Sequence, residues 1–264
     1  MSIRNNYKHT LTASYFGYIT QAIVNNFAPL LFVTFQRSFG ISLEKIAGLV
    51  TVNFFMQLVV DLACAKFIDR IGYRVSIVAA HLFAGAGLIM LGTLPFALPD
   101  PYIGLLISIG FYAVGGGLIE VLISPIVEAC PTDKKSAAMS LLHSFYCWGH
   151  VAVILLTTLF FVTAGIKNWH FLAYLWAIIP FANAVYFCLV PINSLAAEGG
   201  AAPMKELFKS KLFWILAVLM VCSGASEQAM SQWSSAFAEA GLKVSKTVGD
   251  LLGPCMFAIL MGLS

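Results

Sequence analysis

Long apolar segments recur along almost the whole chain, and no other feature restricts its possible folds as strongly. A helix that crosses a membrane needs about 20 predominantly apolar residues. Eight segments approach or exceed this length, at 11–35, 42–66, 75–98, 102–127, 136–163, 170–191, 212–236 and from Thr247 to Ser264. Of the 264 residues 60% are hydrophobic and only 10% are charged, whereas soluble domains have about 25% charged residues. The sequence therefore predicts an all-α, multi-pass membrane protein.

One connection between these segments is longer and more polar than the others. It contains Glu-Gly-Gly-Ala-Ala-Pro followed by several lysines, a composition typical of a linker between domains. We therefore expect a six-helix N-terminal half at 1–191, a cytoplasmic linker at 192–211 and an incomplete C-terminal half at 212–264. Because the last apolar segment is still running at Ser264, the expectation is a C-terminally truncated chain.

The distribution of basic residues predicts the orientation, because cytoplasmic loops of membrane proteins carry an excess of Lys and Arg. If the N-terminus is cytoplasmic, ten basic residues lie inside and five outside. The inner ones are Arg4, Lys8, Lys66, Arg70, Arg74, Lys134, Lys135, Lys205, Lys209 and Lys211. We expect a protein of the inner or plasma membrane with its N-terminus in the cytoplasm. The net charge of only +3 gives no indication of a nucleic-acid partner.

A short basic loop follows the second segment and reads Asp69-Arg70-Ile-Gly72-Tyr-Arg74. Gly72 suits a tight turn, and the two arginines suit the anionic surface of the inner leaflet. An ordinary cytoplasmic loop is one interpretation. The loop also resembles the signature Gly-x-x-x-Asp-Arg-x-Gly-x-Arg of the major facilitator superfamily, with Ala65 in place of the leading glycine. The resemblance implies two six-helix halves, alternating access, and an inner gate formed by Asp69, Arg70, Gly72 and Arg74.

Two further patterns resemble the fucose permease branch of that superfamily, whose members are sugar/proton symporters. The fourth segment carries a glycine-rich run, 115–117, followed by Glu120, and the first segment carries the pair Asn25-Asn26. The resemblance implies a sugar-like substrate, protons as the coupling ion, and a substrate-binding role for these three polar residues.

Other positions depart from the permease pattern. Pro29 stands where the family has an aspartate, and His143 and Tyr146 stand where its fifth span has Gln and Asn. The identity of the sugar and the coupling to protons therefore do not carry over with the resemblance alone.

Acidic residues inside a membrane are informative, because a mid-helix carboxylate costs about 2.5–3.5 kcal/mol on insertion scales and usually faces a cavity. At a rise of about 1.5 Å per residue, Glu120 and His143 lie about 12 and 11 Å from the inner ends of their helices. The two side chains could meet across a cavity, with Glu120 as a proton or substrate-hydroxyl site. The alternatives are a structural partner for Glu120 and a packing role for His143.

The first segment has a proline in its apolar centre. Pro29 has no N–H to donate to the carbonyl of Asn25, so we expect that carbonyl to be free at membrane depth beside the side chains of Asn25 and Asn26. Irregular backbone of this kind is tolerated where it lines a cavity or finds a protein partner. The two asparagines are therefore predicted to face substrate, or else to bind neighbouring helices.

The seventh segment carries a polar stripe. Glu227, Gln228 and Gln232 fall on about one face of a helix, and in two parallel six-helix repeats the first and seventh spans border the same central cavity. A sugar offers apolar C–H faces and a rim of hydroxyls, so it suits aromatic platforms among amides and carboxylates. Tyr146 fits this role, with packing as the alternative.

The sequence argues against several other classes of protein. It lacks the aspartate and serine motifs of intramembrane proteases, and its histidines and cysteines have no metal-ligand spacing. We therefore expect no enzyme, no cofactor and no metal. The favoured function is secondary active transport of a small polar solute, such as a monosaccharide, with protons. A drug or metabolite efflux transporter is the alternative, although the segment 136–163 lacks the proline common in such antiporters. A non-transporting fragment is the third interpretation.

Overall fold

The computed structural model describes residues 3–132, 134–193 and 208–263, apart from the side chains of Ala65, Lys66 and Asp69. In this part of the chain every regular element is a helix, and eight helices are long and apolar enough to cross a membrane. The all-helical prediction and its eight spans are confirmed. Most of the predicted linker, at 194–207, lies outside the described residues.

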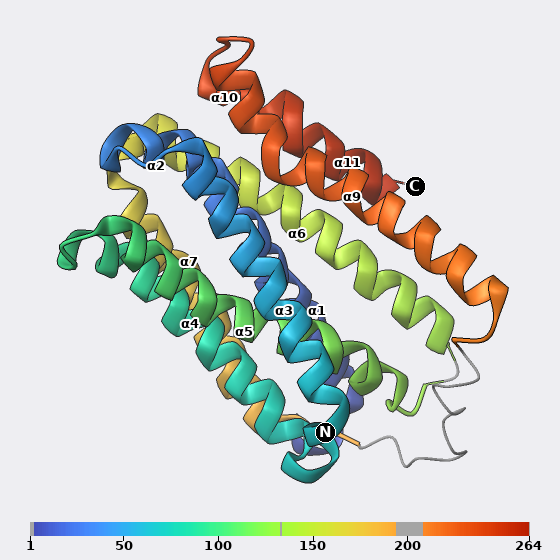
Figure 1. The fold of residues 1–264 in the computed structure, drawn as a ribbon. Coiled ribbons are helices and arrows are strands. Elements are labelled where there is room, and N and C mark those ends of the chain that lie inside the picture. Colours follow the sequence, from blue (N-terminus) through green and yellow to red (C-terminus); the bar gives the residue numbers. More distant parts are fainter. Residues whose placement is uncertain (1–2, 133, 194–207, 264) are drawn as a thin grey trace.

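The first six spans pack together as one bundle (Figure 1). They are α1 (Tyr7–Asn26) with its continuation α2 (Phe32–Phe39), α3 (Leu43–Ile71), α4 (Tyr73–Ala97), α5 (Pro101–Glu128), α6 (Lys135–Ala164) and α7 (Trp169–Leu189). Two further spans follow. They are α9 (Lys211–Ala240) and a composite of α10 (Lys246–Asp250), a π-helical turn (Leu251–Cys255) and α11 (Met256–Leu263).

The first span is not one continuous α-helix. Helix α1 ends at Asn26, a 3₁₀ turn covers Ala28–Leu31, and α2 begins at Phe32. Pro29 lies in this turn and cannot donate a backbone hydrogen bond, so the α-helical ladder is interrupted there. The break leaves the backbone carbonyl of Asn25 near the middle of the span.

Glycines let α5 approach its neighbours closely. A Cβ atom on Gly115 would lie 2.5 Å from the carbonyl oxygen of Ala80 in α4, and one on Gly87 of α4 would lie 2.5 Å from the backbone nitrogen of Tyr112. Small residues at such crossings are common in membrane bundles, because packing rather than hydrophobicity drives association in lipid. The glycine-rich run thus explains the tight α4–α5 contact and places Glu120 one turn farther along α5.

A buried histidine connects three helices of the bundle. The ring of His81 is fully buried in α4, with Nδ1 2.8 Å from the carbonyl of Ile77. Asn183 of α7 donates Nδ2–H to Nε2 of His81 at 2.8 Å and to the carbonyl of Ala13 in α1 at 3.0 Å. With Nε2 as acceptor, Nδ1 carries the proton and donates to Ile77. His81 is therefore satisfied within the bundle.

The last two spans contact the six-helix bundle mainly at one end. In α9 the buried residues are Ser231, Gln232, Ser235 and Ala236, all in its second half, whereas Leu212 and Met220 in the first half are 63% and 76% exposed. We call the end with these contacts the α10 side, and the opposite end, where α3 turns into α4, the Gly72 side. The buried contacts of α9 lie on the α10 side, and α1 and α3 diverge from α9 toward the Gly72 side (Figure 1).

Candidate functional site

The carbonyl that Pro29 frees is bound by the seventh span. The side-chain Nε2 of Gln232 in α9 donates to the backbone oxygen of Asn25 in α1 at 3.0 Å, and both residues are buried. Two predicted site residues, one in the first span and one in the seventh, thus meet directly. The hydrogen bond satisfies a carbonyl that would otherwise be unpaired at membrane depth.

The side chain of Asn25 is also occupied. Its Oδ1 accepts from Nε2 of Gln57 at 2.9 Å and lies 3.5 Å from Nδ2 of Asn53, both in α3. Asn25, Asn53 and Gln232 line a cavity of about 10 Å³, roughly the volume of one water molecule. Asn25 and Gln232 therefore lie in a buried polar seam where α1, α3 and α9 meet, rather than in an open cavity.

Asn26 differs from Asn25, because one of its polar atoms has no partner. Its Nδ2 donates to the carbonyl of Ala22 at 2.9 Å and lies 3.5 Å from the hydroxyl of Tyr146 in α6, whereas its Oδ1 is buried without a hydrogen bond. An unpaired buried acceptor is costly in a folded protein. It is also a group to which a solute hydroxyl could donate.

Glu120 lies at an exposed position on α5. Gln21 of α1 donates from Nε2 to its Oε2 at 3.3 Å, and the carboxylates of Asp61 and Glu227 are close enough to interact with it electrostatically. The sequence does not single out Gln21, although its place one turn before Asn25 puts it on the same face of α1.

His143 is exposed on α6, and its ring centroid lies 5.7 Å from that of Tyr18 in α1. The Tyr18 hydroxyl is 3.1 Å from Oγ of Ser124, which lies one turn after Glu120 on α5. Within the described part of the chain no hydrogen bond joins Glu120 to His143. His143 and Ser124 both contact Tyr18, which was not predicted as a site residue and whose ring also lies 6.4 Å from that of Tyr146.

The polar stripe of α9 is only partly engaged with other helices. Glu227 and Gln228 are half-buried, and their described hydrogen bonds run to Ser231 of the same helix. The hydroxyl of Ser231 donates to the backbone carbonyl of Glu227 at 3.0 Å. Farther along, the ring of Trp233 packs 5.3 Å from that of Phe32 in α2. Gln232 is thus the member of the stripe that contacts the six-span bundle.

The predicted gating loop forms a tight turn. Gly72 has φ +91° and ψ 142°, and it both ends α3 and begins α4. Nη1 of Arg74 donates to the carbonyls of Phe187 and Cys188 at 2.8 and 3.2 Å, so it binds the C-terminal end of α7, where a cation is favoured. Arg70 is exposed. The side chain of Asp69 lies outside the described residues.

Among the described residues no group of three or more His, Cys, Asp or Glu side chains could hold a metal ion. The side chains that converge on the broken first span are amides, carboxylates and aromatic rings, which suit the binding of a polar solute by hydrogen bonds.

The fold is that of a multi-pass helical membrane protein, with a six-span bundle and further spans that meet it across a polar seam. The sequence profile of the Major Facilitator Superfamily matches residues 14–264. The chain therefore belongs to this superfamily, as its signature loop implied, and the family indicates a transporter rather than an enzyme. A search with the sequence finds no matching curated protein.

Solved transporters share the fold at low sequence identity. A D-xylose–proton symporter is 16% identical with a TM-score of 0.64, covering 97% of this chain and 64% of its own. A POT family transporter in complex with a thioalcohol-conjugated peptide is 19% identical with a TM-score of 0.56, covering 84% and 47%. A bacterial homologue of the human drug peptide transporters PepT1 and PepT2 is 18% identical with a TM-score of 0.54, covering 90% and 55%. The chain thus spans about half to two thirds of these proteins.

Proposed function

We propose that the protein is a secondary active transporter that moves a small polar solute by alternating access between its two groups of helices. The observation that carries this proposal is the hydrogen bond between Gln232 and the Asn25 carbonyl, because it joins the first and seventh spans at the break caused by Pro29. Irregular backbone at membrane depth is typical of transporter binding sites. The contacts on the α10 side and the separation on the Gly72 side correspond to one of the two end states.

A monosaccharide moved together with protons is the substrate class that we favour. The unpaired Oδ1 of Asn26 can accept from a sugar hydroxyl, and the ring of Tyr146 beside it offers an apolar face. Glu120, at an exposed position on α5, offers a carboxylate that can accept a proton. The resemblance to fucose permeases and the shared fold with a D-xylose–proton symporter support this choice. His143, Glu227 and Gln228 would line the same path.

The location and orientation follow from the charge pattern. We place the protein in the cell membrane with the N-terminus and the Gly72 side in the cytoplasm, because twice as many basic residues lie on that side. The loop of Asp69, Arg70, Gly72 and Arg74 would then form the cytoplasmic gate. The halves at 1–191 and 212–264, with a linker between them, remain a proposal on the same basis.

Uptake by vesicles tests the proposal, with the protein expressed from its complete reading frame. An inward proton gradient should drive accumulation of a labelled monosaccharide such as fucose or xylose. Glu120→Gln should abolish this gradient-driven accumulation while sugar exchange without a gradient continues, because the amide keeps the hydrogen-bonding shape but cannot take up a proton. Glu128→Gln, at the exposed end of the same helix, is the matched control. Unchanged coupling in Glu120→Gln would contradict the assignment.

The acidic character of the path favours one alternative, the efflux of a cationic drug or metabolite. Asp61 and Glu227 both interact electrostatically with Glu120, and a carboxylate at membrane depth attracts a cation. The same vesicles distinguish the two functions. Transport of a lipophilic cation such as tetraphenylphosphonium, without sugar uptake, would favour efflux.

A further inference from the structure

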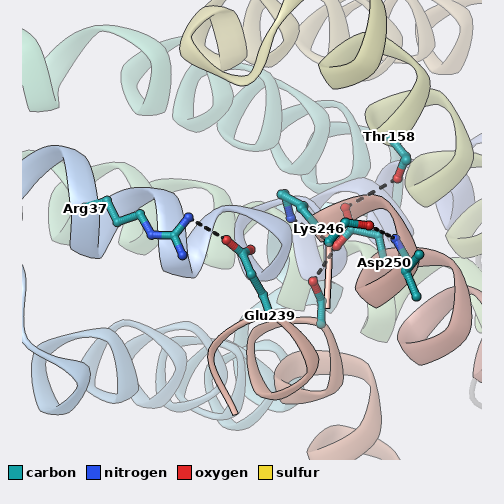
Figure 2. Close-up of polar contacts among 8 residues, drawn as sticks. Arg37, Thr158, Glu239, Lys246 and Asp250 are labelled. Atoms are coloured by element: carbon teal, nitrogen blue, oxygen red, sulfur yellow. Dashed lines mark hydrogen bonds and ion pairs between the residues drawn. The ribbon is translucent and has the colours of Figure 1, made fainter. Parts of the chain in front are cut away.

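A second polar cluster lies on the α10 side, away from the candidate substrate path. Its centre is Asp250 at the end of α10, whose side chain is fully buried. The carboxylate accepts hydrogen bonds from the hydroxyl of Ser235, from Nζ of Lys246 at 3.0 Å and from Oγ1 of Thr158 at 3.4 Å (Figure 2). Asp250 has one carboxylate oxygen toward Thr158 and the other toward Ser235 and Lys246.

The three donors come from three different helices. Thr158 belongs to α6 of the six-helix bundle, Ser235 belongs to α9, and Lys246 lies one turn before Asp250 in α10. Nζ of Lys246 also lies 5.6 Å from the ring centroid of Phe161, on the face of α6 that carries Thr158. A single buried carboxylate thus connects the first six spans to both of the later ones.

The burial of this cluster distinguishes it from the ion pair that joins α2 to α9. Arg37 of α2 and Glu239 of α9 lie 2.8 Å apart, but the Arg37 side chain is 69% exposed (Figure 2), and water and salt weaken such surface pairs. The Lys246 side chain is only 17% exposed and that of Asp250 is fully buried. Separation of the helices would therefore leave a desolvated carboxylate with fewer donors.

We propose that Asp250 is a conformational latch that holds α6 against α9 and α10 and keeps the transport path closed on the α10 side. Opening of the path requires the Thr158–Asp250 hydrogen bond to break. The bonds from Ser235 and Lys246 to Asp250 stay intact, because α9 and α10 move together. The latch rests on the alternating-access function proposed above. It adds to that function a residue outside the substrate path that sets the balance between the two end states.

Thr158→Val tests the latch, because it removes the bond across the halves and leaves the Lys246–Asp250 pair in place. Thr157→Val is the matched control, since the buried hydroxyl of Thr157 has no hydrogen-bond partner. Spin labels on Leu43→Cys and Leu242→Cys, both exposed on the α10 side, report the distance between the halves. The full 264-residue chain is measured in lipid nanodiscs, after replacement of its exposed cysteines by serine.

Thr158→Val should increase the population with the longer label distance about two- to tenfold relative to the parent, the shift expected for one hydrogen bond. Thr157→Val should leave the distribution unchanged, and Thr158→Ser, which keeps the hydroxyl, should behave like the parent. Equal distributions in the two valine variants would overturn the latch, as would a shift in Thr158→Ser equal to that in Thr158→Val. The measurement uses no substrate, so a failure to transport sugar leaves its outcome unaffected.

Discussion

At the scale of single residues, the buried polar groups of this chain divide into those that neighbouring helices satisfy and those left unpaired. The Asn25 carbonyl, His81 and Asp250 are bound by partners from other helices. Oδ1 of Asn26 and Oδ1 of Asp61 are buried without a described hydrogen bond. Because an unpaired buried acceptor destabilises a fold, these two oxygens are acceptors to which a water molecule or a solute could donate.

Gly72 allows a prediction that separates its structural role from any role in gating. Its backbone, at φ +91° and ψ 142°, lies in a region that is nearly restricted to glycine, and other residues there cost about 1–3 kcal/mol. Gly72→Ala should lower the free energy of unfolding by about this amount, measured by denaturation in detergent. No neighbouring atom lies within 4 Å of a Cβ atom on Gly72, so the cost is backbone strain rather than a clash.

Gly110→Ala is the control for this substitution. A Cβ atom on Gly110 also has no atom within 4 Å, but the residue lies in α5 with an ordinary helical backbone. Alanine there should be neutral or stabilising by up to about 1 kcal/mol. Equal losses of stability in the two variants would show that the positive φ of Gly72 is not the cause.

At the scale of the helices, the broken first span determines how the two halves touch. The interruption at Pro29 leaves the Asn25 carbonyl without its helical donor, and Gln232 of α9 supplies the replacement. A break in one helix is thus coupled to the placement of another. The contribution of Gln232 to the stability of the fold should therefore depend on Pro29.

A double-mutant cycle tests this dependence. Gln232→Leu should lower the free energy of unfolding by about 1–3 kcal/mol, because it leaves a buried carbonyl unpaired. In a Pro29→Ala background the cost should be smaller, since the introduced alanine can donate its own N–H to the Asn25 carbonyl as in a regular helix. Denaturation of the four proteins in detergent measures the coupling.

Gln228→Leu serves as the control in both backgrounds, because its described contact lies within α9. Its cost should not depend on which residue stands at position 29. A cost of Gln232→Leu that is the same with proline and with alanine would contradict the link between the helix break and the contact across the halves.

At the scale of the whole molecule, the sequence predicts the number and position of the spans well, because membrane insertion depends on the summed hydropathy of each segment. The sequence predicts poorly how each helix is rotated about its own axis, and therefore which side chains meet. Gln21 and Gln57 contact predicted site residues without having been singled out, and Glu120 and His143 do not meet directly. Side-chain partners depend on packing across helices distant in sequence, which a single apolar pattern does not encode. The i,i+4 spacing of Gln21 and Asn25 puts both on one face of α1, and this spacing is the sequence feature that identifies Gln21 as a candidate site residue.

In the proposed transporter, the arrangement of the helices makes access to the path one-sided. On the α10 side, the Gln232–Asn25 bond and the contacts of Asp250 join the halves, whereas on the Gly72 side the first half of α9 stands apart and His143 is exposed. A membrane-impermeant thiol reagent should therefore reach His143→Cys from the Gly72 side alone. If the N-terminus is cytoplasmic, this reaction should require inside-out vesicles.

Labelling of intact cells and of inside-out vesicles measures both the orientation of the chain and the side from which the path is accessible. The exposed Cys188 and Cys222 are first replaced by serine. Leu242→Cys on the α10 side should react in intact cells, and Arg70→Cys and His143→Cys should react only in inside-out vesicles. Reaction of Arg70→Cys in intact cells would reverse the predicted orientation. Reaction of His143→Cys from the same side as Leu242→Cys would show instead that the α10 side is open, because the reagent reaches His143 from that side only by passing the contacts of Gln232 and Asp250.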